Sequence, residues 1–137
     1  MPHVSEIHFK ERFLAIVLGS ADLPKKALDR HILFFSATLS LEPGRAYAEK
    51  EIDDHLHVWA LRFGRNLHLD HVSLRRYLVD HRYLSRDTSG RSYRLTPGDA
   101  YYSFEPSVRS IDLEALVQEE VAARDRKRQQ YLQKMDD

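Results

Sequence analysis

The segment from Leu69 to Leu95 constrains the fold more than any other part of the chain. Within it, Leu74 and Leu78 are four residues apart, and residues at that spacing lie on one face of a helix. Asp70 comes just before this apolar face and is a residue type that caps helix N-termini. The spacing therefore predicts a helix over residues 70–82 whose leucines are buried.

Two short runs of alternating apolar and polar residues follow this helix, Tyr83–Arg86 and Ser92–Leu95. They flank a polar turn that contains Gly90, and such alternation around a turn is typical of a β-hairpin. A helix followed by a hairpin is the second half of a winged helix-turn-helix. In helix-turn-helix proteins that bind DNA, the second helix enters the major groove.

The predicted helix and hairpin carry an excess of arginine. Residues 75–94 contain six arginines against two aspartates, and the guanidinium group offers a planar set of donors that suits phosphate and guanine. We therefore expect duplex DNA to bind here. A charged, solvated surface is the bland alternative, and the fold alone does not establish function. The candidate DNA-binding residues are His71, Ser73, Arg75, Arg76, Arg82, Arg86, Arg91 and Arg94.

The residues upstream predict the first helix of the same fold. Pro24 suits a first helical position, because its missing N–H has no partner there in any case. The helix is expected to run from Pro24 to about Leu39. Its apolar residues, spaced four, three and four apart, are Leu28, Ile32, Phe35 and Leu39.

Three further elements complete the predicted core. Arg45–Tyr47 is expected to form a very short strand that pairs with the hairpin, and a helix follows from Glu49 to about Leu61. A turn over Arg62–Asn66 leads into the helix described first. The order helix, strand, helix, helix, hairpin predicts a mainly α fold with a small β-hairpin. We interpret residues 23–96 as a winged helix-turn-helix core.

Helical extensions are predicted at both ends of this core. Apolar spacing over Ser5–Leu18 favours a helix that Gly19 ends with a positive φ, and a strand over Leu14–Leu18 is the alternative. A long helix is expected from Ile111 to about Lys134, with an apolar stripe interrupted by a wholly polar stretch. The N-terminal helix (residues 1–22) and the last segment (residues 97–137) are therefore candidates for a dimer interface.

The connector between the core and the last helix, from Ala100 to Ser110, is expected to be irregular. It contains three aromatic residues within four positions. We expect them to anchor the connector to the core or to a partner chain, and stacking on bases is the alternative. These residues are Tyr101, Tyr102 and Phe104.

The region from about Leu23 to Leu95 resembles a small bacterial family known as domain of unknown function 2087. The residues that carry the resemblance are Leu23-Pro24, Glu42-Pro43-Gly44-Arg45 with Tyr47, Glu49-x-Glu51-Ile52, Asp70-x-x-x-Leu74-Arg75-Arg76-x-Leu78-Val79-Asp80, and Arg86 with Tyr93. Ala48 and Asp53 depart from the family pattern, which has Thr or Ser and Asn there. The family is similar to winged helix-turn-helix regulators, so the resemblance implies a fold and no specific activity.

Composition narrows the remaining classes of function. The chain has no cysteine, which excludes disulfides and cysteine-based metal or nucleophile sites. We find no signal peptide, no membrane-spanning run and no catalytic or cofactor-binding motif, so we expect a cytoplasmic protein without cofactor that is not an enzyme. Eight histidines leave a metal sensor as a weaker alternative.

These inferences lead to one functional hypothesis and one rival. The hypothesis is a DNA-binding protein that acts as a homodimeric transcriptional regulator. The rival is an adaptor that uses the same arginine face to bind an acidic protein. Zero net charge, from 21 basic and 21 acidic residues, weakens the first, because a positive overall field would aid DNA association.

Overall fold

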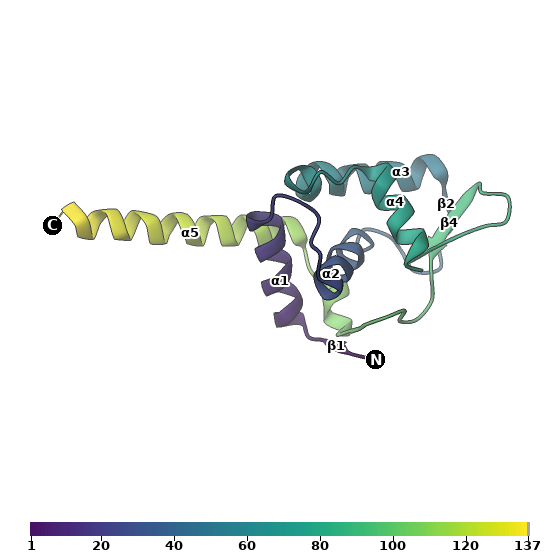
Figure 1. Ribbon diagram of the computed structural model, residues 1–137, viewed down its shortest axis with the longest axis horizontal. Coiled ribbons are helices and arrows are strands. Elements are labelled where there is room, and N and C mark those ends of the chain that lie inside the picture. The colour runs from purple at the N-terminus through teal and green to yellow at the C-terminus, as the bar shows by residue number, and fades with distance from the viewer. Residues whose placement is uncertain (137) are drawn as a thin grey trace.

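A computed structural model describes residues 1–136 of the chain. It consists of a body, which holds the helices α1 to α4 and the strands, and a long helix that projects from this body (Figure 1). The helices of the body are α1 (Glu6–Gly19), α2 (Ala27–Ala37), α3 (Glu49–Trp59) and α4 (His71–Asp80). The projecting helix is α5 (Leu113–Asp136).

A three-stranded antiparallel sheet packs beside α4. Its strands are β2 (Tyr47–Ala48), β3 (Leu84–Arg86) and β4 (Ser92–Leu95), in the order β2-β4-β3. β2 pairs with β4 through Tyr47 and Tyr93, so the short strand between α2 and α3 joins the hairpin. The fold is mainly helical with a small hairpin, and the predicted order helix, strand, helix, helix, hairpin is confirmed.

A second, very small sheet was not predicted. β1 (His3–Val4) runs parallel to β5 (Ser103–Phe104), and a 3-10 helix over Pro106–Ser110 follows. The expectation of an irregular connector is therefore wrong. A strand of two residues is too short to show a periodic pattern in the sequence. The two strands pair because the chain returns to its own N-terminus, where the Glu105 amide donates a hydrogen bond to the Val4 carbonyl at 2.9 Å.

α1 packs on α2 within one continuous apolar core. The helix is confirmed against the alternative of a strand, and its buried residues are Phe9, Phe13, Ile16 and Val17. The predicted role of Gly19 is wrong, because Gly19 is the last helical residue, its φ is not positive, and Ser20 caps the end. Since its apolar face is used inside its own body, α1 is a poorer candidate for a dimer interface than α5.

The boundaries of α2 and its buried face also differ from the prediction. α2 begins at Ala27, so Pro24 lies before the helix and not at its first position. Buried residues surround most of the helix, including Asp29, His31 and Phe34, because α1, α4 and the connector all pack on it. A helix enclosed in this way has no single apolar stripe, and spacing alone could not find its buried residues.

The predicted turn after α3 is instead more helix. A π-helical segment (Ala60–Gly64) and a 3-10 turn (Arg65–Leu67) continue α3 towards α4. Gly64 allows this close approach, because a Cβ there would lie 2.8 Å from the Leu69 carbonyl oxygen. At its other end α4 stops at Asp80, two residues before the predicted end, because Arg82 takes a left-handed conformation with φ +63° that turns the chain into β3.

A buried histidine ties α2 to the hairpin. The Nδ1 atom of His31 lies 2.6 Å from the hydroxyl of Tyr83, and the rings of His81, Tyr101 and Tyr102 surround it. Burial lowers the pKa of His31 to about 4, with a further contribution from His81. His31 is therefore neutral near pH 7, and its Nδ1 shares a hydrogen bond with the Tyr83 hydroxyl. The prediction that the aromatic connector residues anchor it to the core agrees with these contacts.

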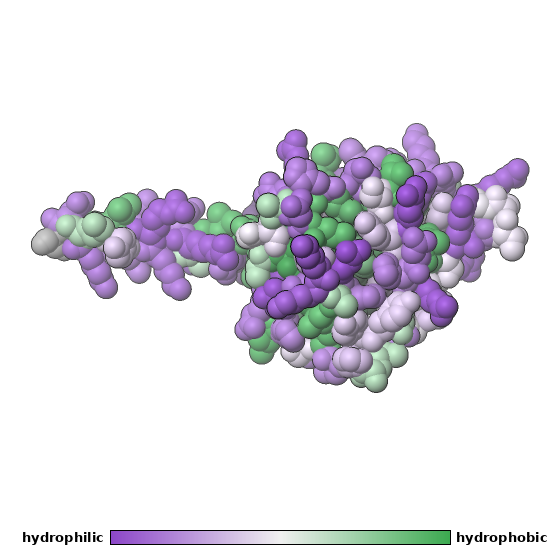
Figure 2. Space-filling view, viewed as in Figure 1, coloured by the Kyte–Doolittle hydropathy of each residue, from purple (hydrophilic) through white to green (hydrophobic). Residues whose placement is uncertain are grey.

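α5 differs from the body in its surface. Leu113 is its buried residue, and every described residue from Arg124 onward is exposed. Figure 2 shows hydrophilic residues over most of this helix, with apolar residues reappearing towards its free end. Among the described residues, no helix combines the length and the apolar character needed to cross a membrane.

Candidate nucleic-acid interface

α4 is held firmly against the core, with a polar face outward. The Oδ1 atom of Asp70 accepts a hydrogen bond from the amide of Ser73 at 2.7 Å, which caps the helix and lowers the pKa of Asp70. Leu74 and Leu78 are fully buried. The outward face carries Arg76, which is exposed, so α4 is positioned as the sequence predicted.

The hairpin presents one apolar and one polar face. Tyr93 and Leu95 of β4 are buried, while Arg94 between them is exposed. Leu84 pairs with Leu95 and Ser85 pairs with Arg94, so the two strands keep the same alternation. The sheet therefore fixes the outward direction of Arg94.

The tip of the hairpin is closed by one carboxylate. Asp87 accepts hydrogen bonds from the hydroxyl of Ser89 at 2.9 Å and from the amide of Arg91 at 2.9 Å, and Gly90 supplies the positive φ of the turn. These bonds, the one from Ser89 foremost, lower the pKa of Asp87 to about 2. Because the carboxylate faces its own turn, the exposed side chain of Arg91 is the outward charge of the tip.

Arg75 differs from the other candidate residues, because it is engaged inside the protein. Its Nη1 atom lies 2.7 Å from Asp53 Oδ1 and 3.1 Å from Glu49 Oε1, and its side chain is 21% exposed. The guanidinium also lies 5.7 Å from the centre of the Tyr93 ring. Arg75 thus joins α3, α4 and β4. Asp53 provides the closer of the two carboxylates.

A hollow of about 300 Å³ separates α4 from the hairpin. Three guanidinium groups reach it, from Arg75, Arg76 and Arg86, and Asp80 is the carboxylate on its wall. Arg86 lies over the Tyr93 ring at 5.9 Å and fills the space beneath Gly90. A concave surface with this concentration of guanidinium groups suits an anion such as a phosphate.

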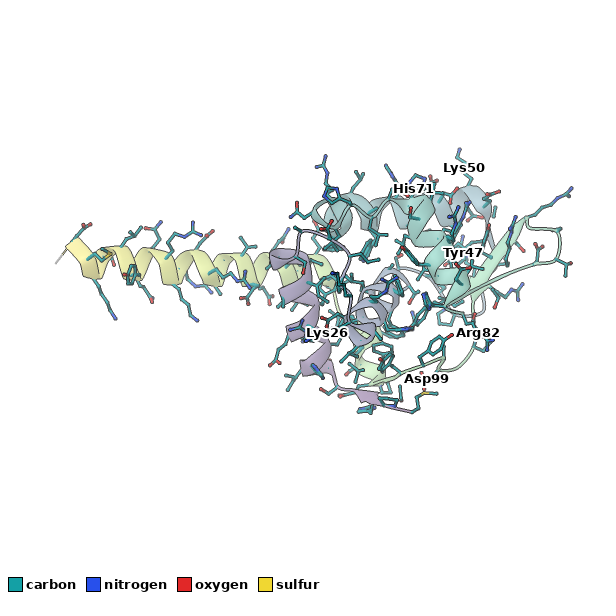
Figure 3. All side chains as sticks on the ribbon, viewed as in Figure 1. Lys26, Tyr47, Lys50, His71, Arg82 and Asp99 are labelled. Carbon is teal, nitrogen blue, oxygen red and sulfur yellow. The ribbon has the colours of Figure 1, made fainter. Side chains whose placement is uncertain are left out.

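The remaining candidate residues lie at the two ends of α4. Figure 3 places His71 at the start of the helix and Arg82 beyond its end, near Asp99. Arg82 lines a separate hollow with Pro97–Tyr101, and Ser73 is half-buried with its amide used by the cap. The structure therefore gathers Arg75, Arg76 and Arg86 in one place, sets Arg91 and Arg94 on the adjoining hairpin, and leaves Arg82 apart.

His71 meets another histidine. Its Nδ1 atom lies 3.3 Å from Nδ1 of His57 in the last turn of α3. Within residues 1–136, no group of three or more histidine or acidic side chains is arranged to hold a metal ion. The metal-sensor alternative therefore gains no ligand set from the described part of the chain.

Five exposed arginines on α4, just after it and on the hairpin have no acidic partner within the described residues. They are Arg76, Arg82, Arg86, Arg91 and Arg94, whereas Arg12, Arg45 and Arg62 each form an ion pair. Elsewhere in the described residues, Arg65, Arg126 and Arg128 are also exposed and unpaired. The sequence patterns did not identify Tyr93, whose ring lies beneath the guanidinium groups of Arg75 and Arg86. The alternation of polar and apolar residues in β4 places Tyr93 on the inward face, and this pattern could have identified it.

The comparisons with known proteins identify one family. Residues 21–95 match a family described as "Uncharacterized protein conserved in bacteria (DUF2087)". The match covers more than half of the chain and contains α2, α3, α4 and the hairpin. No curated protein and no solved structure matches the chain.

Proposed function

We propose that this chain, which belongs to the DUF2087 family, binds duplex DNA as a homodimeric transcriptional regulator. The observation that carries the proposal is the set of exposed arginines without acidic partners on α4 and the hairpin, around the hollow that separates them. A regulator of this kind acts in the cytoplasm, where the bacterial chromosome lies.

In this proposal α4 enters the major groove. Arg76 points outward from a helix whose other face is fixed to the core, so its guanidinium is available to a guanine edge or a nearby phosphate. Arg91 at the tip and Arg94 on β4 contact phosphates or the adjoining minor groove. Arg75 has a supporting role, because it neutralises Asp53 and Glu49, which would otherwise repel the DNA backbone.

A second copy is part of the proposal for an energetic reason. A single module of this size makes few base contacts, and useful specificity is usually obtained by binding two half-sites. α5 is the preferred interface, since α1 buries its apolar face in its own body.

A fluorescence-anisotropy titration tests DNA binding. One labelled duplex has random sequence, and the other comes from upstream of the protein's own gene. Binding that weakens with added salt, and that is tighter for the upstream duplex, supports a regulator. If the folded protein binds neither duplex at low salt, an adaptor that binds an acidic protein becomes the leading hypothesis.

Two substitutions locate the interface. Arg76→Ala should weaken binding to the upstream duplex by about 1–3 kcal/mol if Arg76 reads a base, while Arg91→Ala should weaken binding to both duplexes equally. Lys26→Ala is the matched control, because Lys26 is exposed and lies away from α4 and the hairpin (Figure 3). Equal binding by wild type and both arginine variants would remove the interface from this face.

A further inference from the structure

α5 is longer than its own body can support. It has 24 residues, which corresponds to about 36 Å, and its packing on the body ends within its first turns. Most of the stability of protein helices comes from tertiary packing of one face. An isolated helical arm of this length therefore lacks the contacts that usually hold such a helix in place (Figure 1).

The free end of α5 carries an exposed apolar cluster. Tyr131 is 64% exposed, Leu132 48% and Met135 67%. Their spacing places them close together on the helix surface. Clusters of large apolar side chains at a surface mark sites of association, so this end requires a partner surface of similar character.

An apolar hollow of about 310 Å³ lies at the other end of the same helix. α2, α3, the π-helical segment and the start of α5 surround it, and its wall includes Leu39, Val58, Trp59, Phe63 and Ile111. The indole N–H of Trp59 is already satisfied by Ser36 at 3.0 Å, so this part of the wall offers apolar contact. The hollow has the chemical character that the tip of α5 requires.

The charges between these two ends are separated along the helix. Residues 114–120 contain Glu114, Glu119 and Glu120 and no basic residue, while residues 124–128 contain four basic residues and one acidic residue. Glu114 and Glu120 also pair within the chain, with Arg62 and Arg124, which leaves Glu119 and most of the basic segment unpaired among the described residues. Two antiparallel copies of α5 that cross between Val121 and Arg124 place each acidic segment beside the partner's basic segment. Parallel copies would place like charges together.

The same register brings the two ends together. When the two-fold axis passes between Val121 and Arg124, residues 131–135 of one copy lie opposite residues 110–114 of the other, at the apolar hollow. Val121 lies on the same face of α5 as Leu132 and Met135, which follow it by 11 and 14 residues, so the crossing and the tip can face the partner together. An isologous arrangement of this kind satisfies both tips at once.

We propose that two copies of this chain associate through antiparallel α5 helices, each seating the Tyr131–Met135 end in the hollow at the base of the partner's α5. This arrangement deepens the homodimer of the proposed function, and it is independent of DNA. It places the two bodies at opposite ends of the helix pair. The two α4 helices then lie further apart than one turn of DNA, and the half-sites are separated accordingly.

Cross-linking tests the antiparallel register. The chain has no cysteine, so single cysteines report cleanly with a short bis-maleimide. Val121→Cys should link to itself. Lys134→Cys and Ser110→Cys should link only when the two variants are mixed, and Thr88→Cys at the hairpin tip should not link. If Lys134→Cys links to itself, the helices are parallel and the proposal is wrong.

Light scattering on the wild-type chain tests the occupant of the hollow. We expect twice the monomer mass of 16.1 kDa for the wild type. Leu132→Asp should be a monomer whose body remains folded, while α5 loses part of its helical signal in circular dichroism. The double variant Glu119→Lys/Glu120→Lys should be monomeric alone. Mixing it with Arg126→Glu/Arg128→Glu should restore a dimer.

A monomeric wild type, or a dimer that Leu132→Asp leaves intact, would overturn the proposal. Both measurements are made without DNA, so they separate the two hypotheses. A monomer that still binds DNA contradicts this dimer alone. A cross-linked dimer that does not bind DNA would contradict the proposed function but not the antiparallel dimer.

Discussion

The body and the arm formed by α5 are both helical, but they use their side chains in opposite ways. In the body, every buried side-chain polar atom of the described residues has a hydrogen-bond partner, as His31 has in Tyr83 and Trp59 has in Ser36. In the arm, Tyr131 and Met135 are exposed. The body therefore satisfies its own buried polar groups, whereas the free end of the arm leaves large apolar side chains exposed, which the proposed dimer would cover.

The largest expected difference between the two regions comes from truncating one leucine in each. Leu74→Ala removes a fully buried side chain of α4 and should lower the free energy of unfolding by about 2–5 kcal/mol. Leu132→Ala in the arm should leave the unfolding of the body almost unchanged at protein concentrations low enough to keep the chain monomeric. Urea unfolding followed by the fluorescence of Trp59, the single tryptophan, measures both. Equal losses would mean that the arm packs on its own body.

Two glycines extend the contrast to the backbone. Gly64→Ala should cost about 1–3 kcal/mol, because the new Cβ would lie 2.8 Å from the Leu69 carbonyl oxygen and 3.2 Å from the Trp59 ring. Gly19→Ala is the matched control, since its Cβ meets nothing within 4 Å and its φ is not positive. Thermal unfolding of both variants checks this. A Gly64→Ala protein as stable as the wild type would show that the π-helical segment shifts to accommodate the added methyl group without a loss of stability.

The buried histidine of the body predicts a pH dependence that the arm lacks. Unfolded chain takes up a proton at this position near pH 6.5, while the folded chain resists protonation until about pH 4. The unfolded state then binds more protons between these values, so stability falls as the pH falls from 6.5 to 4. His31→Asn should flatten this dependence in urea unfolding over that range. An unchanged slope in His31→Asn would assign it to other groups.

The smallest expected effect separates two neighbouring arginines. Arg75→Gln should lower the free energy of unfolding by about 1 kcal/mol, because it leaves Asp53 and Glu49 without their partly exposed partner. Arg76→Gln should leave stability unchanged, since Arg76 is exposed and unpaired within residues 1–136. Parallel urea titrations decide this, and a larger loss in Arg76→Gln would reverse the assigned roles.

Local patterns predicted the parts of the site that depend on neighbouring residues. The cap at Asp70, the buried Leu74 and Leu78, and the alternation of the hairpin follow from helix and strand geometry. They sufficed to place α4 and its outward Arg76. The strand before α3 was also predicted, although it begins two residues later and ends one residue later than expected.

Sequence patterns did not predict the features that depend on contacts between residues far apart in the chain. Arg75 and Arg76 are equivalent in sequence, and only the packing of α3 against α4 brings Asp53 to one of them. Three further features also depend on how distant segments pack together. They are the π-helical segment after α3, the pairing of β1 with β5, and the left-handed conformation of Arg82. The eight predicted contact residues therefore do not form one continuous surface.

The salt dependence of DNA affinity tests the central claim most directly. The measurement compares wild type with the Arg76→Ala/Arg91→Ala double variant on the random-sequence duplex. We predict a linear fall of log affinity with log salt, and a slope smaller by roughly 1 for each phosphate contact that the variant loses. Identical slopes for the two proteins, or no binding by either at low salt, would contradict DNA binding through α4 and the hairpin.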